Sequence, residues 1–408
     1  MRITDLFADI AGLIKPDKVT IDNVVFQLHS KITVTMLIAF SIIVTTVQYF
    51  GDPIECYSTS ESVPSGLLNT FCWITTTFSI PSSWRKLVGQ DVPYPGVGSA
   101  LDEEDHVYHT YYQWVCFALY IQALGFAVPS FLWKMLAEDK ITSLVMDLDQ
   151  HIVQKERSQK CQSLVKFLIK SRGSHGGTFY CFILLEVMNA VNVLAQMFLM
   201  DRFLGGNYWS FGLNFLKHRT TISPYDDPAL FDPLIRVFPR MTKCTFHRFG
   251  SSGDVERHDA LCLLSVNHVN EKIFIVIWFW FMALVIASTI GIIYRMLTYF
   301  STDLRIIVLQ ARCRMASPLV LEEIVSRSAT GDWFLLSLLA KNMDGFNFKS
   351  VADLYLRGLR DLSARTSSPP YADSPLYPAV LPDYSDDFEM KVVQPESFSA
   401  SSFRPGSH

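Results

Sequence analysis

Four long apolar runs constrain the fold of this chain more than any other feature. A single charged residue, Glu186, interrupts them; the runs are Ile32–Gly51, Thr110–Trp133, Gly173–Met200 and Ile273–Tyr294. About 20 residues at roughly 1.5 Å per residue cover the roughly 30 Å hydrocarbon core of a bilayer. The sequence therefore predicts an all-α membrane protein whose subunit has four transmembrane helices. A soluble two-domain enzyme is excluded on the same ground.

Composition and motifs narrow the class of function further. Half of the residues are hydrophobic, 18% are charged, and the net charge is −4, so no basic stripe indicates a nucleic-acid partner. The partner that these proportions predict is membrane lipid. The sequence contains no phosphate-binding glycine loop, nucleophile elbow or His-Glu-x-x-His motif. We therefore expect neither an enzyme nor a bound cofactor or metal.

The distribution of Lys and Arg predicts the orientation of the spans. The loop 52–109 holds two such residues, whereas 134–172 holds eight, and basic residues are retained on the cytoplasmic side. With four spans, both termini then lie in the cytoplasm. The predicted segments are a cytoplasmic arm 1–31, spans 32–51, 110–133, 177–200 and 273–294, outside loops 52–109 and 201–272, a cytoplasmic loop 134–176, a cytoplasmic helical region 295–362 and a tail 363–408.

The tail differs in composition from the rest of the chain. Of its 46 residues, 17 are Ser or Pro. Few apolar side chains remain to offset the entropy of ordering, so disorder is expected.

Four cysteines fall in the two outside loops, two in each. An oxidising exterior lets Cys56, Cys72, Cys244 and Cys262 form disulfides, and four cysteines allow three pairings that spacing cannot separate. The alternative is a zinc site formed by Cys244, Cys262 and two histidines between them, His247 and His258. Zinc would leave Cys56 and Cys72 to pair only with each other.

Polar residues inside the spans are candidates for a pore wall. Ser41, Thr45 and Gln48 recur at helical spacing on one stripe of the first span. They either face water or form a helix-packing surface. The third span has a second polar face, formed by Glu186, Asn189, Asn192 and Gln196. This face is too polar to contact lipid, so it either has a channel function or joins helices by hydrogen bonds. Pro129 is expected to kink the second span.

Residues 2–14 read as an amphipathic helix. Its apolar face is opposed by Arg2, Asp5 and Asp9, and Pro16 limits its continuation. The helix could lie on the inner leaflet or fold into the pore mouth. Only Arg2 and Lys15 are basic, which favours the pore because anionic lipid would repel the two carboxylates. Rings of Asp5 and Asp9 would then favour cations.

The start of the second span carries a recognisable motif, Tyr111-Tyr112-Gln113-Trp114-Val115. Further motifs extend the match to about residue 340; they are Gly51-Asp52-Pro53-Ile54-Glu55-Cys56, Phe238-Pro239-Arg240-Met241-Thr242-Lys243-Cys244-Thr245 and Gly331-Asp332-Trp333-Phe334. By these motifs the chain resembles the innexins, the invertebrate gap-junction proteins, which are related to the pannexins.

The resemblance implies a function and an assembly. It implies a large-pore channel whose subunits, of one or several innexin kinds, form an octameric ring that docks to a ring on a neighbouring cell. It also implies the pairings Cys56 with Cys262 and Cys72 with Cys244. The alternatives are an undocked pannexin-like hemichannel and a four-span adhesion protein without a pore. No Asn-x-Ser/Thr triplet occurs, which favours docking because no N-linked glycan obstructs it.

Overall fold

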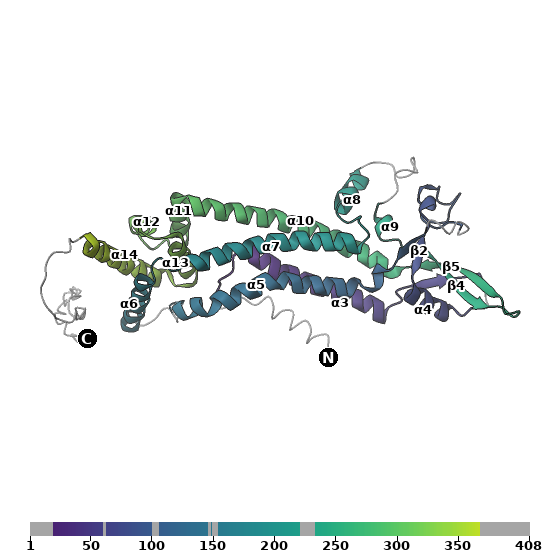
Figure 1. Cartoon of the computed structure of the whole chain (residues 1–408), viewed down its shortest axis with the longest axis horizontal. Helices are drawn as coiled ribbons and strands as arrows, with labels where there is room; N and C mark the ends of the chain where they lie inside the picture. The colour runs from purple at the N-terminus through teal and green to yellow at the C-terminus, as the bar shows by residue number, and fades with distance from the viewer. Residues whose placement is uncertain are drawn as a thin grey trace, which may run out of the picture. The chain divides into compact units, whose positions relative to one another are not determined.

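The computed structural model describes residues 19–59, 63–99, 106–145, 148, 154–220 and 233–367. Its longest helices are the four that are apolar enough to cross a membrane (Figure 1). The first span is Val24–Phe50, which combines α2 (Val24–Gln27), the π-helix η1 (Leu28–Thr33) and α3 (Val34–Phe50). The other three are α5 (Val115–Val145), α7 (Gly176–Phe203) and α10 (Ser265–Phe300). The predicted four-span helical subunit is confirmed.

The helices run further than the predicted apolar segments. The first begins at Val24 rather than Ile32, α5 begins at Val115 and continues to Val145, and α10 contains 36 residues. At roughly 1.5 Å per residue, α10 is about 54 Å long, well beyond the hydrocarbon core. Hydropathy therefore located the four long helices but not their ends, because it marks only the most apolar part of each helix.

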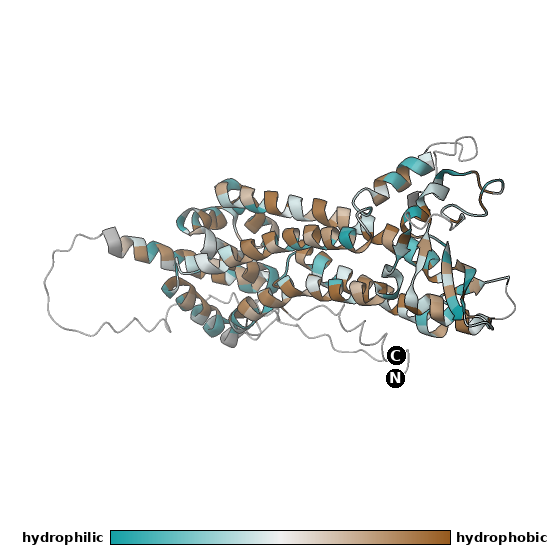
Figure 2. Ribbon diagram, turned by 45° about the vertical axis from the view of Figure 1, so that its right-hand side comes forward, coloured by the Kyte–Doolittle hydropathy of each residue, from teal (hydrophilic) through white to brown (hydrophobic). Residues whose placement is uncertain are grey.

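The four spans pack side by side, with α3 against α5 and α10, and α7 against α5 and α10. Figure 2 shows hydrophobic residues along these helices, including on their outward surfaces. Exposed apolar side chains such as Ile121, Leu184 and Ile290 lie on three of the spans. In a single subunit, such side chains mark surfaces that lipid or another subunit covers.

The two outside loops fold together into one domain around a five-stranded antiparallel sheet. The strand order is β1-β5-β4-β2-β3. The strands are β1 (Glu55–Tyr57), β2 (Thr77–Ser79), β3 (Val107–His109), β4 (Met241–Phe249) and β5 (Val255–Leu263). Short helices complete the domain: α4 (Ser65–Thr75), η2 (Pro81–Arg85), η3 (Tyr111–Gln113), α8 (Phe211–Thr220) and α9 (Pro233–Val237). Since β1–β3 come from the first loop and β4–β5 from the second, neither loop forms the sheet alone.

The cytoplasmic ends of the spans join a bundle of shorter helices. These are α6 (Gln154–Lys170), α11 (Thr302–Arg312), α12 (Pro318–Arg327), α13 (Thr330–Asn342) and α14 (Gly345–Ser367). One apolar core continues from the inner halves of α5 and α7 into this bundle, around Trp133, Phe182 and Trp333. A second core joins the outer halves of the spans to the sheet domain.

The end of the chain forms a separate unit, Leu362–His408. Its first residues are the last turns of α14, which continues to Ser367, past the boundary at Ser363 predicted for the tail. The remainder of the predicted tail lies outside the described residues.

Candidate functional site

Two disulfides tie the outside loops together. Cys56 on β1 is bonded to Cys262 on β5, and Cys72 on α4 is bonded to Cys244 on β4. Cys56 and Cys262 are also directly opposite each other in the register of the two strands. Each bond joins an element of the first loop to an element of the second, in the pairing that the family resemblance implied.

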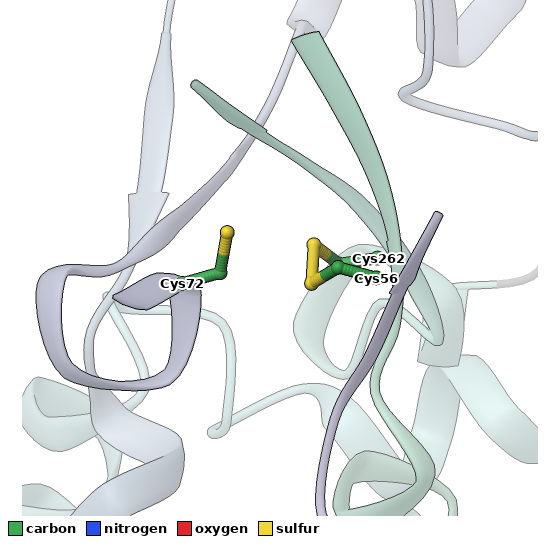
Figure 3. Close-up of side chains that lie close together, drawn as sticks. All are labelled: Cys56, Cys72 and Cys262. Atoms are coloured by element: carbon green, nitrogen blue, oxygen red, sulfur yellow. A yellow bond between two sulfur atoms is a disulfide. The ribbon is translucent and has the colours of Figure 1, made fainter. Parts of the chain in front are cut away.

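The same bonds remove the zinc alternative. The Sγ atoms of Cys56, Cys72 and Cys262 lie within 4.8 Å of one another, and Figure 3 shows Cys72 beside the Cys56–Cys262 bond. A cysteine binds zinc as a thiolate, and a disulfide sulfur is not one. Cys244 and Cys262 are each bonded to a different cysteine, so they cannot supply the two sulfur ligands of that site.

The buried cation Lys243 adds a polar tie between the loops. Its Nζ donates to the carbonyl oxygen of Gly98 at 2.9 Å and lies 2.9 Å from Asp259 Oδ2. Gly98 belongs to the first loop and Asp259 to β5. The side chain of Lys243 is 8% exposed, whereas that of Asp259 is 60% exposed, so water still reaches the carboxylate of this ion pair.

The signature motif attaches the sheet domain to the second span. Tyr111 Oη donates to the carbonyl oxygen of Val237 at 2.8 Å, and Tyr112 Oη donates to that of Cys72 at 3.3 Å. Gln113 Nε2 donates to the carbonyl oxygen of Trp73. Val115 is fully buried, whereas the side chain of Trp114 is exposed. Four of the five motif residues therefore pack or bond at the junction between the outside domain and the membrane helices.

A buried histidine lies immediately before this motif. His109, the last residue of β3, has its Nε2 2.8 Å from the hydroxyl oxygen of Ser79 on β2. Burial lowers the pKa of His109 to about 4. The imidazole is therefore neutral at physiological pH and acts as a structural hydrogen-bonding group.

The fourth span is attached to the same domain by a separate set of contacts. Arg240 Nη2 lies 2.7 Å from Oε2 of Glu271, and Asn267 Nδ2 donates to the carbonyl oxygen of Pro239 at 2.8 Å. Asn267 and Glu271 lie at the outer end of α10, and Pro239 and Arg240 lie just before β4. The sheet is thus fixed to α5 on one side and to α10 on the other.

The polar stripe of the first span makes hydrogen bonds within the subunit. Ser41 Oγ donates to the carbonyl oxygen of Cys116 at 2.9 Å, and Gln48 Nε2 donates to that of Tyr112 at 2.8 Å. Thr45 Oγ1 donates to the carbonyl oxygen of Ser41 at 2.7 Å. The bonds of Ser41 and Gln48 correspond to the helix-packing alternative. A pore-facing role for this stripe stays a prediction.

Pro129 lies inside α5, and the third-span residue Asn192 compensates for it. Proline has no N–H to donate to the carbonyl four residues earlier, which is that of Gly125. Asn192 Nδ2, on α7, donates to that carbonyl oxygen at 3.3 Å. Gln196 also packs against Gly125, so a Cβ at that position would displace the amide of its side chain. Two candidate features from different spans therefore meet at one helix contact.

Glu186 forms a buried ion pair with Arg295. Arg295 on α10 donates through Nε to Oε2 and through Nη2 to Oε1, each at 2.8 Å. Asn23, just before α2, donates to Oε1 at 2.6 Å. The guanidinium of Arg295 also lies 4.7 Å from the ring centroid of Phe182. Glu186 thus joins three spans, as in the helix-joining interpretation. Asn189 is buried nearby on the same face.

The segment that precedes the first span is held by the cytoplasmic bundle. The amide of Thr20 donates to Asn342 Oδ1 at 2.6 Å, and Asn342 Nδ2 donates back to the carbonyl oxygen of Thr20 at 3.1 Å. Lys341 Nζ donates to the carbonyl oxygen of Asp22 at 2.7 Å. Residues 1–18 of the predicted arm, with Arg2, Asp5 and Asp9, lie outside the described residues.

Sequence reasoning missed several partners in this network. Arg295 directly follows the charge-free run Ile273–Tyr294, and that position is the one signal in the sequence that it could pair with Glu186. Asn342 and Asn267 gave no signal, because their partners are backbone groups more than 20 residues away.

These features define a four-span membrane protein whose two outside loops form one covalently tied domain. Among protein families, residues 22–357 match the family described as innexin. The chain is 44% identical to innexin inx2 of Drosophila melanogaster over 85% of its length and 94% of that protein. It is 43% identical to innexin shaking-B of the same species over 85% of this chain and 92% of that protein. It is 41% identical to innexin inx2 of Schistocerca americana over 86% of this chain and 97% of that protein.

The chain therefore belongs to the innexin family. It is a subunit of a gap-junction channel and a multi-pass protein of the plasma membrane.

Proposed function

We propose that eight copies of this subunit, alone or mixed with other innexin subunits, form a ring around a pore. Two such rings on apposed cells dock through their outside domains and let ions and small metabolites pass. The ring size and the docking follow from the family resemblance. The observation that supports docking best is the covalently tied outside domain, because docking between cells requires a surface of fixed shape.

The tip of the β4–β5 hairpin is the part of this domain that we assign to docking. The hairpin lies at the end of the subunit opposite the cytoplasmic helices (Figure 1). At its tip the side chains of Phe249 and Val255, which are opposite each other in the register, are 75% and 62% exposed. Exposed apolar residues of this kind are typical of surfaces that become buried on association.

A single substitution tests this assignment. Phe249→Asn creates an N-glycosylation triplet with Gly250 and Ser251, whereas Phe249→Gln removes the same ring without creating one. If the hairpin docks, the glycosylated variant should lose dye transfer between cells and keep hemichannel current. Unchanged transfer with confirmed glycosylation would contradict docking through this hairpin, and loss of current in both variants would indicate misassembly.

We further propose that the N-terminal arm selects the ions that pass. The polar stripe of the first span, Ser41, Thr45 and Gln48, would line the pore beyond it. Asp5 and Asp9 would form acidic rings, with Arg2 beside them. The double substitution Asp5→Asn and Asp9→Asn should lower the permeability to cations relative to anions. Reversal potentials under a salt gradient measure this ratio, and an unshifted value in assembled channels would place the selectivity filter elsewhere.

A further inference from the structure

An apolar cavity of about 340 Å³ lies where α5 and α7 reach the cytoplasmic bundle. Its wall includes Ile141 and Leu144 of α5, Phe167 of α6, and Leu335 and Leu338 of α13. The cavity is far larger than a single water site, and its lining offers water few hydrogen-bonding partners. An apolar ligand is therefore the occupant that suits its interior.

The cavity is a fixed feature of the helix arrangement. The amide of Gly173 donates to Asp332 Oδ2 at 2.8 Å, which holds the start of α13 against the loop before α7. At Gly331 the two segments are so close that a Cβ would lie 2.6 Å from the carbonyl oxygen of His175. Further along, α13 presents its apolar face to the cavity.

The mouth of the cavity is polar and carries positive charge. Lys140, Ser143, His175 and Thr178 also line it. Burial lowers the pKa of His175, an effect that the Asp332 carboxylate opposes and Lys140 reinforces, so the imidazole is neutral at physiological pH. Thr178 lies in the first turn of α7, a helix of 28 residues whose leading amides point toward this end. A helix N-terminus and a lysine together attract an anionic group.

We propose that this cavity binds one acyl chain of an anionic phospholipid from the inner leaflet, with the phosphate beside Lys140 and the start of α7. The site lies at the cytoplasmic ends of two membrane spans, so leaflet lipid is the amphiphile present at the highest local concentration. The inner leaflet is also the one that carries anionic headgroups. The proposal needs only the fold of the subunit and does not depend on ring size or docking.

Filling the mouth of the cavity tests the acyl-chain site. Ser143 lines the cavity, whereas its neighbour Thr142, which is exposed as Ser143 is, does not. Purified channels would be incubated with 1-palmitoyl-2-oleoyl phosphatidic acid, and the lipid retained per subunit would be measured by native mass spectrometry. Ser143→Trp should lose the retained lipid and Thr142→Trp should keep it. Equal retention by wild type and Ser143→Trp would overturn the proposal.

A second pair of variants tests the headgroup. Lys140→Gln should lower the affinity for phosphatidic acid about fivefold, the effect of one lysine near an anionic lipid. Lys349→Gln, an exposed change on α14, should leave it unaltered. Phosphatidylcholine with the same chains should bind more weakly to wild type, and inorganic phosphate should not compete. Equal binding of the two lipids would refute the anionic headgroup, and competition by phosphate alone would refute the lipid.

Discussion

Neutralising one partner of the Glu186–Arg295 pair should destabilise the subunit strongly. The two side chains are 5% and 8% exposed, so water cannot solvate the charge left behind by either substitution. Removing one partner of a buried ion pair costs about 3–5 kcal/mol. Glu186→Gln keeps an oxygen for Asn23 and so isolates the loss of charge from the loss of that hydrogen bond.

The double substitution Glu186→Gln with Arg295→Gln measures the coupling. Two glutamines can hydrogen-bond to each other without a buried charge, so the double variant should lose at least about 2 kcal/mol less than the sum of the single losses. Unfolding of purified protein by SDS in mixed micelles, followed by tryptophan fluorescence, gives the three free energies. Additive losses would refute the reasoning, because the two groups would then not stabilise each other in the folded state.

An exposed ion pair supplies the control. Arg360 on α14 donates to the Glu323 carboxylate on α12, and both side chains have access to water. Arg360→Gln should change the unfolding free energy far less than Arg295→Gln, because water solvates the carboxylate that remains. Similar losses at the two sites would show that burial is not what makes the Glu186 pair important.

Three further predictions concern individual contacts. Asn192→Leu should lower the unfolding free energy by about 1–2 kcal/mol, because the Gly125 carbonyl is left without a donor. Pro129→Ala supplies a backbone amide that restores this donor, so the double variant should recover most of the loss. The pKa of His109 is about 4 in the folded state, so the unfolded state binds more protons between pH 6.5 and 4. The unfolding free energy should therefore fall by up to about 3 kcal/mol as the pH falls through this window. His109→Gln should flatten this pH profile. Tyr111→Phe should cost about 1–3 kcal/mol in the same assay, because the carbonyl oxygen of Val237 at the end of α9 loses its donor. Tyr108→Phe, an exposed change, is the control, and a loss for Tyr111→Phe no larger than that of the control would contradict this role.

The spans could be predicted from the sequence, but the sheet could not. Lipid imposes a continuous apolar run on each span, and that run is visible without any knowledge of the fold. Strands β1 to β3 contain three residues each, too few for an alternating pattern to stand out. The longer β4 and β5 pair with each other within the second loop, but both carry charged residues, and their outer neighbours, β2 and β1, come from the first loop.

Polar residues in the spans could be found from the sequence, but their partners could not. Glu186 and Asn192 were recognised because polar groups are rare in lipid. That Glu186 binds Arg295, and that Asn192 serves the carbonyl freed by Pro129, depends on the rotation of one helix against another. A single sequence does not encode that rotation in any local pattern. The disulfide pairing came from the family resemblance for the same reason.

Helix α10 has a mechanical consequence for the channel. It runs without a break from Glu271, which pairs with the sheet domain through Arg240, to Arg295, which pairs with α7. No proline interrupts it, so a displacement at one end is transmitted as a movement of the whole rod rather than absorbed by a hinge. Thermodynamic linkage is reciprocal. Any cytoplasmic ligand whose affinity changes when two rings join must alter the affinity of the rings for each other by the same factor.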